Sequence, residues 1–189
     1  MRSRIGAVIT LTATLLIPAV VASAAPLAPA AQENKLQLFR SVQRQVLQYP
    51  HYTVFDSVSV QIDNGTVTLI GKVTMPYKRS DIERRVAGVA GVRQVVNQIE
   101  VLPVSKGDDD LRLAIARAIY GHPTFRPYAS MVNPPIHIIV ERNRVTLEGV
   151  VNDEAERLLA RSIARTFDAF QVTDLLKTEA EASSDLENL

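Results

Sequence analysis

The chain has 189 residues, a formal net charge of +1, 47% hydrophobic residues and no cysteine. The near-neutral charge argues against nucleic acid as the main partner. The lack of cysteine excludes disulfides, thiolate metal sites, a cysteine nucleophile and lipid attachment to an N-terminal cysteine. The charge is unevenly distributed, because residues 33–103 have an excess of Lys and Arg whereas residues 179–189 carry only acidic charges.

Residues 1–24 have the organisation of a secretory signal peptide. A basic start is followed by an apolar run over residues 5–21 and by a small-x-small motif that ends at Ala24. The alternative, an uncleaved membrane anchor, needs about 20 apolar residues, whereas this run is shorter and contains Pro18. We therefore expect cleavage after Ala24 and an exported, periplasmic protein that is peripheral to the membrane, not transmembrane.

An internal repeat organises the rest of the chain. Residues 58–73 recur without gaps as residues 136–151, and both copies contain Val-Thr-Leu followed by x-Gly. Each copy is typical of two alternating strands joined by a tight turn. Asn64 and Gly65 favour a type I′ turn because both tolerate a positive φ, and Asn143 takes the place of Gly65 in the second copy.

A helical pattern precedes each hairpin and ends at a proline, Pro50 or Pro123, which cannot continue a helix. The apolar stripes are Leu38, Phe39, Val42 and Val46 in the first copy and Leu111, Ile115 and Ile119 in the second.

A second helix is predicted after each hairpin. Ser80 with Glu83 forms a capping-box pattern in the first copy, and Asp153 with Glu156 does so in the second. Gly91 is interpreted as the C-terminal stop of the first of these helices.

A third strand closes the first unit over residues 95–101, and its counterpart at 172–178 is weaker. The sequence thus predicts an α+β tandem repeat of two αββαβ modules, each a three-stranded sheet with two helices on one face. The predicted divisions are a flexible segment (25–35), domain 1 (36–103), a linker (104–109), domain 2 (110–178) and an acidic tail (179–189). Asp110 is expected to cap the helix after the linker, and the tail to be disordered or a frayed helix.

The first copy resembles the BON domain in residues 58–73, in the helix that contains Arg84, and in residues 89–99. The two copies together resemble exported two-BON-domain proteins of the osmotically inducible protein Y type. The second copy departs from the family at residues 168–174, where the Gly-Val turn is missing. The sequence therefore does not decide whether the second copy has a complete third strand. The resemblance implies a module without catalytic residues or cofactors. It further implies association with phospholipid membranes or with other envelope proteins, in envelope maintenance or the osmotic stress response.

Two further structural roles are predicted. Gly71 and Gly149 lie near the ends of the second strands, where a glycine indicates close approach by another backbone, here assigned to the packing of the second helix. Asn97 shares a strand face with apolar residues, and a buried amide must be hydrogen-bonded. We expect it to hold a neighbouring loop in place.

The residues that most often carry chemistry form no recognisable site. His51, His122 and His137 are scattered over different elements, and we expect His137 to be an exposed strand histidine. Residues 108–110 lack the alternating ligands of a calcium loop and are interpreted as a solvated linker and helix cap. No serine lies in Gly-x-Ser-x-Gly or Ser-x-x-Lys. We therefore expect no metal, no cofactor and no enzymatic activity.

Two surfaces are candidates for contact with anionic phospholipid or an envelope protein. The first is the basic cluster Lys78, Arg79, Arg84 and Arg85; the alternative is a solvated helix face partly paired with its own carboxylates. The second is the loop from 122 to 135, with Phe125, Arg126, Tyr128 and Met131; the alternative is a loop that folds its apolar groups over its own domain. The leading hypothesis is an envelope binding module, and the competing one is a soluble protein-interaction or chaperone-like module.

Overall fold

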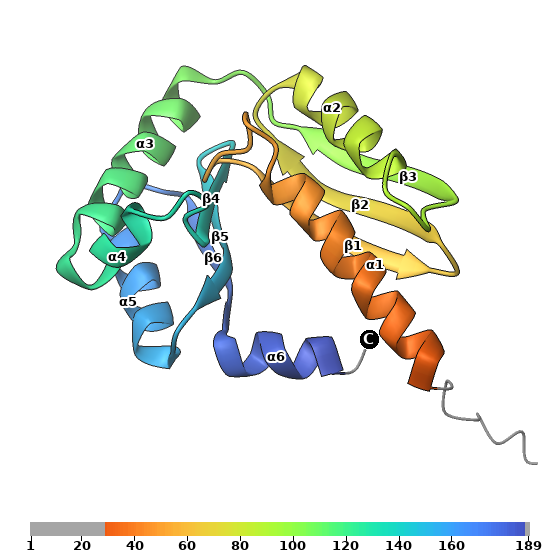
Figure 1. Ribbon diagram of the computed structural model, residues 1–189. Helices are drawn as coiled ribbons and strands as arrows, with labels where there is room; N and C mark the ends of the chain where they lie inside the picture. The colour runs from red at the N-terminus through yellow and green to blue at the C-terminus, as the bar shows by residue number, and fades with distance from the viewer. Residues whose placement is uncertain (1–28, 188–189) are drawn as a thin grey trace, which may run out of the picture.

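The computed structural model describes residues 29–187, which form two units of the same plan (Figure 1). The predicted signal peptide lies outside the described residues. The first unit contains α1 (Pro29–Leu47), β1 (Ser57–Asp63), β2 (Thr66–Val73), α2 (Pro76–Ala87) and β3 (Gln94–Val101). The second contains α3 (Lys106–Gly121), β4 (Ile136–Glu141), β5 (Arg144–Val151), α5 (Glu154–Ala164) and β6 (Gln171–Thr178). The predicted α+β repeat of αββαβ modules is confirmed.

Three further helical segments lie outside this shared plan. Two short ones, η1 (Pro123–Phe125) and α4 (Arg126–Ala129), follow α3. The last, α6 (Glu179–Glu187), occupies the segment predicted to be disordered or a frayed helix, and it has no buried residue. At the other end, α1 begins at Pro29, so residues 29–35, expected to be flexible, are helical.

Each sheet joins an antiparallel hairpin to a parallel third strand, in the orders β1-β2-β3 and β4-β5-β6. The hairpin turns use left-handed residues, with φ of 48° and 80° at Asn64 and Gly65 and of 51° and 60° at Arg142 and Asn143. A parallel partner needs a crossover connection, which α2 and α5 supply. The sequence did not decide whether the second unit has a complete third strand. In the structure this strand, β6, is complete and pairs with β5 over its whole length.

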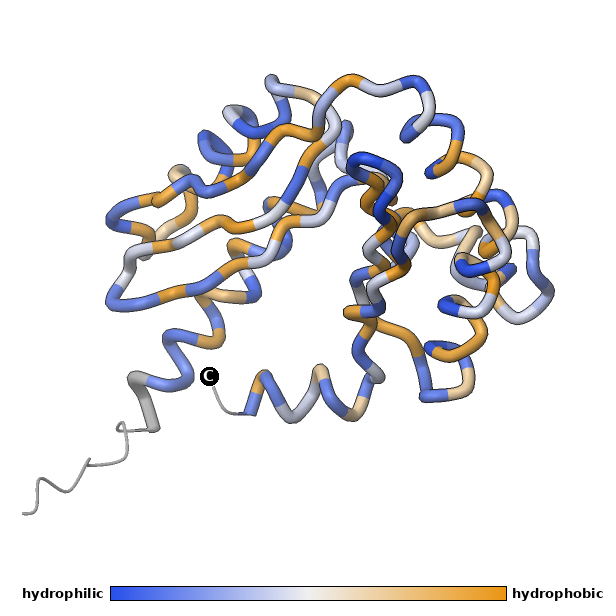
Figure 2. Tube along the Cα trace, turned by 180° about the vertical axis from the view of Figure 1, so that it is seen from behind, coloured by the Kyte–Doolittle hydropathy of each residue, from blue (hydrophilic) through white to orange (hydrophobic). Residues whose placement is uncertain are grey.

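The core of each unit lies between one face of its sheet and the helices that cover it. Apolar and polar residues alternate along the strands (Figure 2), so every second side chain points to the helices. We call the opposite face of each sheet, which points away from these core helices, the open face. Fully buried core residues are Val42, Val46, Val67, Leu69 and Ile82 in the first unit and Ile115, Ile119, Ile138, Val145 and Leu147 in the second.

Gly71 and Gly149 are required by a neighbouring strand, not by the second helix as predicted. A Cβ atom would lie 2.0 Å from the Ser57 carbonyl oxygen at Gly71 and 1.8 Å from that of Pro135 at Gly149. Both glycines also have positive φ, at 147° and 121°. The close backbone approach therefore occurs within the sheet, where the first strand of each hairpin begins.

Both predicted ends of helix α2 differ from the structure. Helix α2 starts at Pro76 without a side-chain cap, and the Ser80 hydroxyl donates instead to the Tyr77 carbonyl at 3.0 Å. It ends at Ala87, so Gly91 lies in the turn before β3 with a φ of 93°. The proline at N1 fixes the start of α2 one turn before the capping-box pattern. The capping residue predicted for α5 is present, since Asp153 accepts from the Glu156 N–H at 2.9 Å.

Helix α3 begins at Lys106, inside the predicted linker, and Ser105 caps it in place of Asp110. Asp108 was expected to be solvated, but it is only 5% exposed. Its carboxylate accepts from the Arg142 and Asn143 N–H groups at 2.9 and 2.8 Å. The β4–β5 turn supplies donors that the sequence pattern of the linker does not reveal, and this explains why an aspartate is buried there.

Asn97 holds a helix and not a loop. Its amide donates to the Arg79 carbonyl at 3.1 Å and to the Glu83 carboxylate at 2.8 Å, and its oxygen accepts from the Ile99 N–H at 3.1 Å. The side chain thus joins β3 to α2.

Candidate functional site

The two units dock through the loop between α1 and β1, which lies against strand β4. We call this loop, residues 48–56, the docking loop. The Ile138 N–H donates to the Val54 carbonyl at 2.7 Å, so this loop satisfies part of the edge of β4. The side chain of Phe55, from the first unit, packs against the hydrophobic core of the second. This contact shows that the units form one docked body.

Two polar contacts between the sheets accompany this packing. Lys72 on β2 forms an ion pair with Glu141 on β4 and lies 3.4 Å from Glu100 on β3. The hydrogen bond with Glu141 raises the pKa of Lys72, although burial opposes the shift. The Ser57 hydroxyl donates to the Glu148 carboxylate on β5. Charged groups therefore bridge the open faces of the two sheets.

A cleft of about 590 Å³ lies between these open faces. Its size is within the range of small-ligand sites, but such sites are usually lined mainly by apolar groups. Here the lining includes both signs of charge, namely Lys72, Arg142, Arg144, Glu100, Glu141 and Glu148, with Ile70 and Ile139 as apolar members. The cleft is suited to polar contacts more than to an apolar small molecule.

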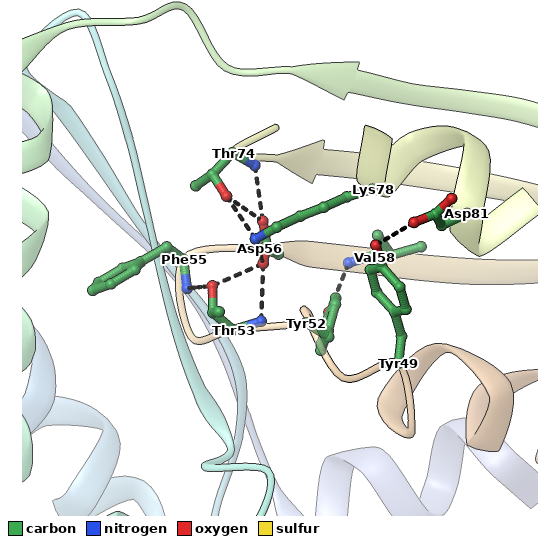
Figure 3. A network of polar contacts seen from close by, with 9 residues as sticks. All are labelled: Tyr49, Tyr52, Thr53, Phe55, Asp56, Val58, Thr74, Lys78 and Asp81. Carbon is green, nitrogen blue, oxygen red and sulfur yellow. Dashed lines mark hydrogen bonds and ion pairs between the residues drawn. The ribbon is translucent and has the colours of Figure 1, made fainter. Parts of the chain in front are cut away.

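A buried ion pair stabilises the docking loop from within the first unit (Figure 3). Asp56 is fully buried and lies 2.6 Å from the Lys78 ammonium, which is itself 4% exposed. The carboxylate also accepts from the backbone N–H and hydroxyl groups of Thr53 and Thr74 at 2.8 to 2.9 Å. Burial by itself raises the pKa of Asp56, but the hydrogen bonds from Lys78, Thr74 and Thr53 together lower it.

His137 is not the exposed strand histidine that the sequence predicts. Its ring lies against Tyr52 of the docking loop, with 5.4 Å between the ring centroids. The Nδ1 atom is buried and has no hydrogen-bond partner among the described residues. Burial lowers the pKa of His137. The residue faces the open side of its sheet as expected, but the first unit covers that side.

The predicted basic cluster is divided by the fold. Lys78 is buried and forms an ion pair with Asp56. Arg85 donates hydrogen bonds to the Gln45 and Gln48 carbonyls at 3.1 and 3.4 Å. Arg84 is exposed and paired with Asp81. Of these four basic residues, only Arg79 and Arg84 are therefore exposed.

The aromatic loop likewise belongs mainly to the core. Phe125 is fully buried and Tyr128 is 7% exposed, because η1 and α4 turn both rings toward α3 and the sheet. The Tyr128 hydroxyl donates to Glu156 at 2.6 Å, and burial followed by this bond raises the pKa of Tyr128 to about 12. Arg126 and Met131 are exposed. For Phe125 and Tyr128 the structure therefore agrees with the alternative reading, a loop that folds its apolar groups over its own domain.

A third surface, absent from the sequence-based candidates, surrounds Phe170, whose exposed fraction is 73%. The Arg144 guanidinium lies over its ring at 4.7 Å, and the Phe170 N–H donates to the Asn143 carbonyl at 2.8 Å. Arg142, also exposed, belongs to the same turn. We call Arg142, Arg144 and Phe170 the arginine–phenylalanine tip. The only sequence signal was the departure of residues 168–174 from the BON pattern.

Within residues 29–187, no group of three His, Asp or Glu side chains is arranged to hold a metal ion. No helix in that range combines the length and the apolar character that crossing a bilayer requires.

Among known proteins, only the match to a family model bears on the architecture. Two solved structures of CdsD, a structural protein of the type III secretion system of Chlamydia trachomatis, are 12% and 14% identical to the chain. They cover 75% and 80% of it and 96% and 97% of their own length, with TM-scores of 0.27 and 0.29, which carry no argument about function. No curated protein matches the chain. The family model of the BON domain matches residues 37–103 and 107–180. These matches span both structural units, and the chain therefore belongs to the BON domain family, with two copies of the domain.

Proposed function

We propose that this protein is a non-catalytic binding protein of the cell envelope that attaches to anionic phospholipid surfaces through the arginine–phenylalanine tip. The observation that carries the proposal is Phe170, a large apolar side chain held 73% exposed beside two arginines. Membership of the BON family supports it, as does the export signal expected from the sequence. The role proposed with it, in envelope maintenance or stress response, rests on the resemblance to exported two-BON-domain proteins.

The tip has the two components of an interfacial anchor. An aromatic ring gains free energy by entering the headgroup region, and each Lys or Arg near an anionic surface contributes about 1 kcal/mol. The backbone that carries the ring is held by a hydrogen bond from the Phe170 N–H to the Asn143 carbonyl and by one from the Asn143 side-chain amide to the Asp168 carbonyl at 3.1 Å, and the Arg144 guanidinium lies over the ring. Little conformational entropy is therefore lost when it binds.

Sedimentation with vesicles tests the proposal. The mature chain should bind vesicles that contain phosphatidylglycerol, should bind pure phosphatidylcholine vesicles less, and should be released by salt. Replacing Arg142 and Arg144 together by alanine should weaken binding roughly 30-fold, because about 2 kcal/mol is lost. Phe170→Ala should weaken binding to anionic vesicles and binding to neutral vesicles by the same factor, because the contribution of the ring is apolar and does not depend on lipid charge.

Matched variants separate this surface from the two predicted from the sequence. Tyr77→Ala removes an aromatic that is 49% exposed on α2, near Arg79 and Arg84, and Met131→Ala removes a side chain that is 48% exposed beyond the aromatic loop. Both should leave binding unchanged. If Tyr77→Ala abolishes binding and Phe170→Ala does not, α2 is the membrane-binding face and the tip is not.

The competing function is a soluble protein-interaction or chaperone-like module. The mixed charges of the cleft between the open faces favour it, because polar groups of both signs are typical of the rim of a protein interface. This function requires indifference to anionic vesicles and recovery of one stoichiometric partner by crosslinking in the periplasm. Charge reversal at Glu100 should then reduce the crosslink.

A further inference from the structure

The interface between the two BON domains contains a histidine in a position that disfavours a positive charge. His137 lies on the open face of β4, paired in register with Glu148 on β5. The docking loop covers it, with the Tyr52 ring 5.4 Å away. Its Nδ1 atom is buried and lacks a partner among the residues described. A positive charge on the ring is therefore disfavoured by desolvation.

We propose that docking of the two domains is acid-sensitive, and that protonation of His137 releases the docking loop from β4. This inference is independent of the membrane-binding proposal. In the docked state the imidazole is neutral. When the domains separate, the ring reaches water and binds a proton freely, so acid favours the separated state.

The groups around His137 decide the sign of this effect. From the docking loop, the Thr53 and Asp56 carbonyls favour the protonated ring, and the Asp56 carboxylate adds a weak attraction that its pair with Lys78 offsets. From β5, Glu148 also favours protonation, but it already accepts from Ser57. Desolvation is the largest influence and outweighs them, so the pKa of His137 in the docked state is below its ordinary value.

The pH window follows from linkage. Because the docked pKa is lowered from 6.5, the docked state is fully favoured above about pH 6.5 and loses stability as the pH falls toward the docked pKa. One proton taken up on opening lowers the docking equilibrium constant by at most about tenfold per pH unit. The Lys72–Glu141 ion pair spans the same interface, and its hydrogen bond raises the pKa of Lys72, so the Lys72 ammonium keeps its charge over this range.

Energy transfer between two labels on the mature chain measures the opening. The chain has no cysteine, so Gln43→Cys on α1 and Ser162→Cys on α5, both exposed, place one label in each domain. Transfer efficiency should fall between pH 7 and pH 5 in the parent. His137→Phe keeps a ring that does not titrate, and its efficiency should be independent of pH. His51→Gln, whose ring lies against Tyr49 and Tyr77 of the first unit, and His122→Gln, whose ring lies beside Phe125, should open like the parent.

Two results overturn the proposal: a parent whose transfer efficiency stays constant to pH 5, or a His137→Phe variant that opens with acid as the parent does. Should that variant fail to fold, the NMR titration of the His137 ring in the parent decides the question. Coincidence of its titration with the loss of energy transfer supports the proposal. Protonation of the ring without loss of transfer refutes it.

Discussion

Replacing Asp56 by alanine removes the acceptor at the centre of the buried network in Figure 3. The carboxylate is fully buried and accepts five hydrogen bonds, from Lys78, from Thr53 and from Thr74. The variant leaves the Lys78 ammonium, whose side chain is 5% exposed, without its partner. Removing one partner of a buried ion pair leaves the other charge buried and uncompensated. The main loss of unfolding free energy therefore comes from the unpaired Lys78 ammonium and not from the lost attraction.

The expected loss for Asp56→Ala is about 3–5 kcal/mol of unfolding free energy. For a chain of this size that corresponds to a Tm lower by roughly 6–20 °C. Lys78→Met should cost less, about 1–3 kcal/mol, since the two threonines still donate four hydrogen bonds to Asp56. The double variant should be more stable than Asp56→Ala by about 2 kcal/mol, because it removes the stranded ammonium.

Urea denaturation followed by circular dichroism measures these differences. The parent should also lose stability in acid. The pKa of Asp56 is lowered in the folded state, so its contribution is present above about pH 4 and is lost as the pH falls through the folded value. Asp56→Ala should lack that part of the acid dependence. Equal stabilities of Asp56→Ala and the double variant would refute the stranded-charge reasoning, and a cost below about 1 kcal/mol would show that the network contributes little.

The remaining predictions concern the sheet, the core and the tail. Gly149→Ala should prevent domain 2 from folding, because the new Cβ would lie 1.8 Å from the Pro135 oxygen. The control Gly107→Ala has nothing within 4 Å of its new Cβ, and thermal melting should show it to be as stable as the parent or slightly more stable. Phe125→Ala should cost about 3–5 kcal/mol in urea denaturation, and Val132→Ala, at a site 97% exposed, should cost less than about 0.5 kcal/mol; similar costs would contradict the assignment of Phe125 to the core. Deleting residues 179–189 should leave Tm unchanged, since α6 buries no residue; a clear drop would mean that its contacts with β5 and β6 stabilise domain 2.

The structure also changes the meaning of one experiment that the sequence suggests. On sequence grounds, alanine at both Phe125 and Tyr128 tests for loss of binding at little cost in stability. Both rings are buried and pack in the core of domain 2. The double variant should therefore unfold that domain, and any loss of binding would report unfolding. Phe170→Ala, at an exposed site, is the informative substitution.

The repeat, the hairpins and the order of elements could be predicted from the amino-acid sequence, because these features depend on local signals. Strand alternation and the turn residues Asn64, Gly65 and Asn143 act over a few residues, and the left-handed φ values follow from them. Even the weak strand over 172–178 forms once β5 offers its edge.

Which side chains are exposed for binding could not be predicted in the same way, because exposure depends on long-range packing. A sequence pattern places polar side chains in solvent, yet three of them are buried because a distant partner satisfies each one. Asp56 pairs with Lys78, the β4–β5 turn donates to Asp108, and Glu156 accepts from Tyr128. Conversely, Phe170 is apolar and remains exposed. The docking of the domains, which covers His137, brings together segments far apart in the chain. Such long-range partners leave no periodic signal, and burial is therefore settled by packing and not by residue type.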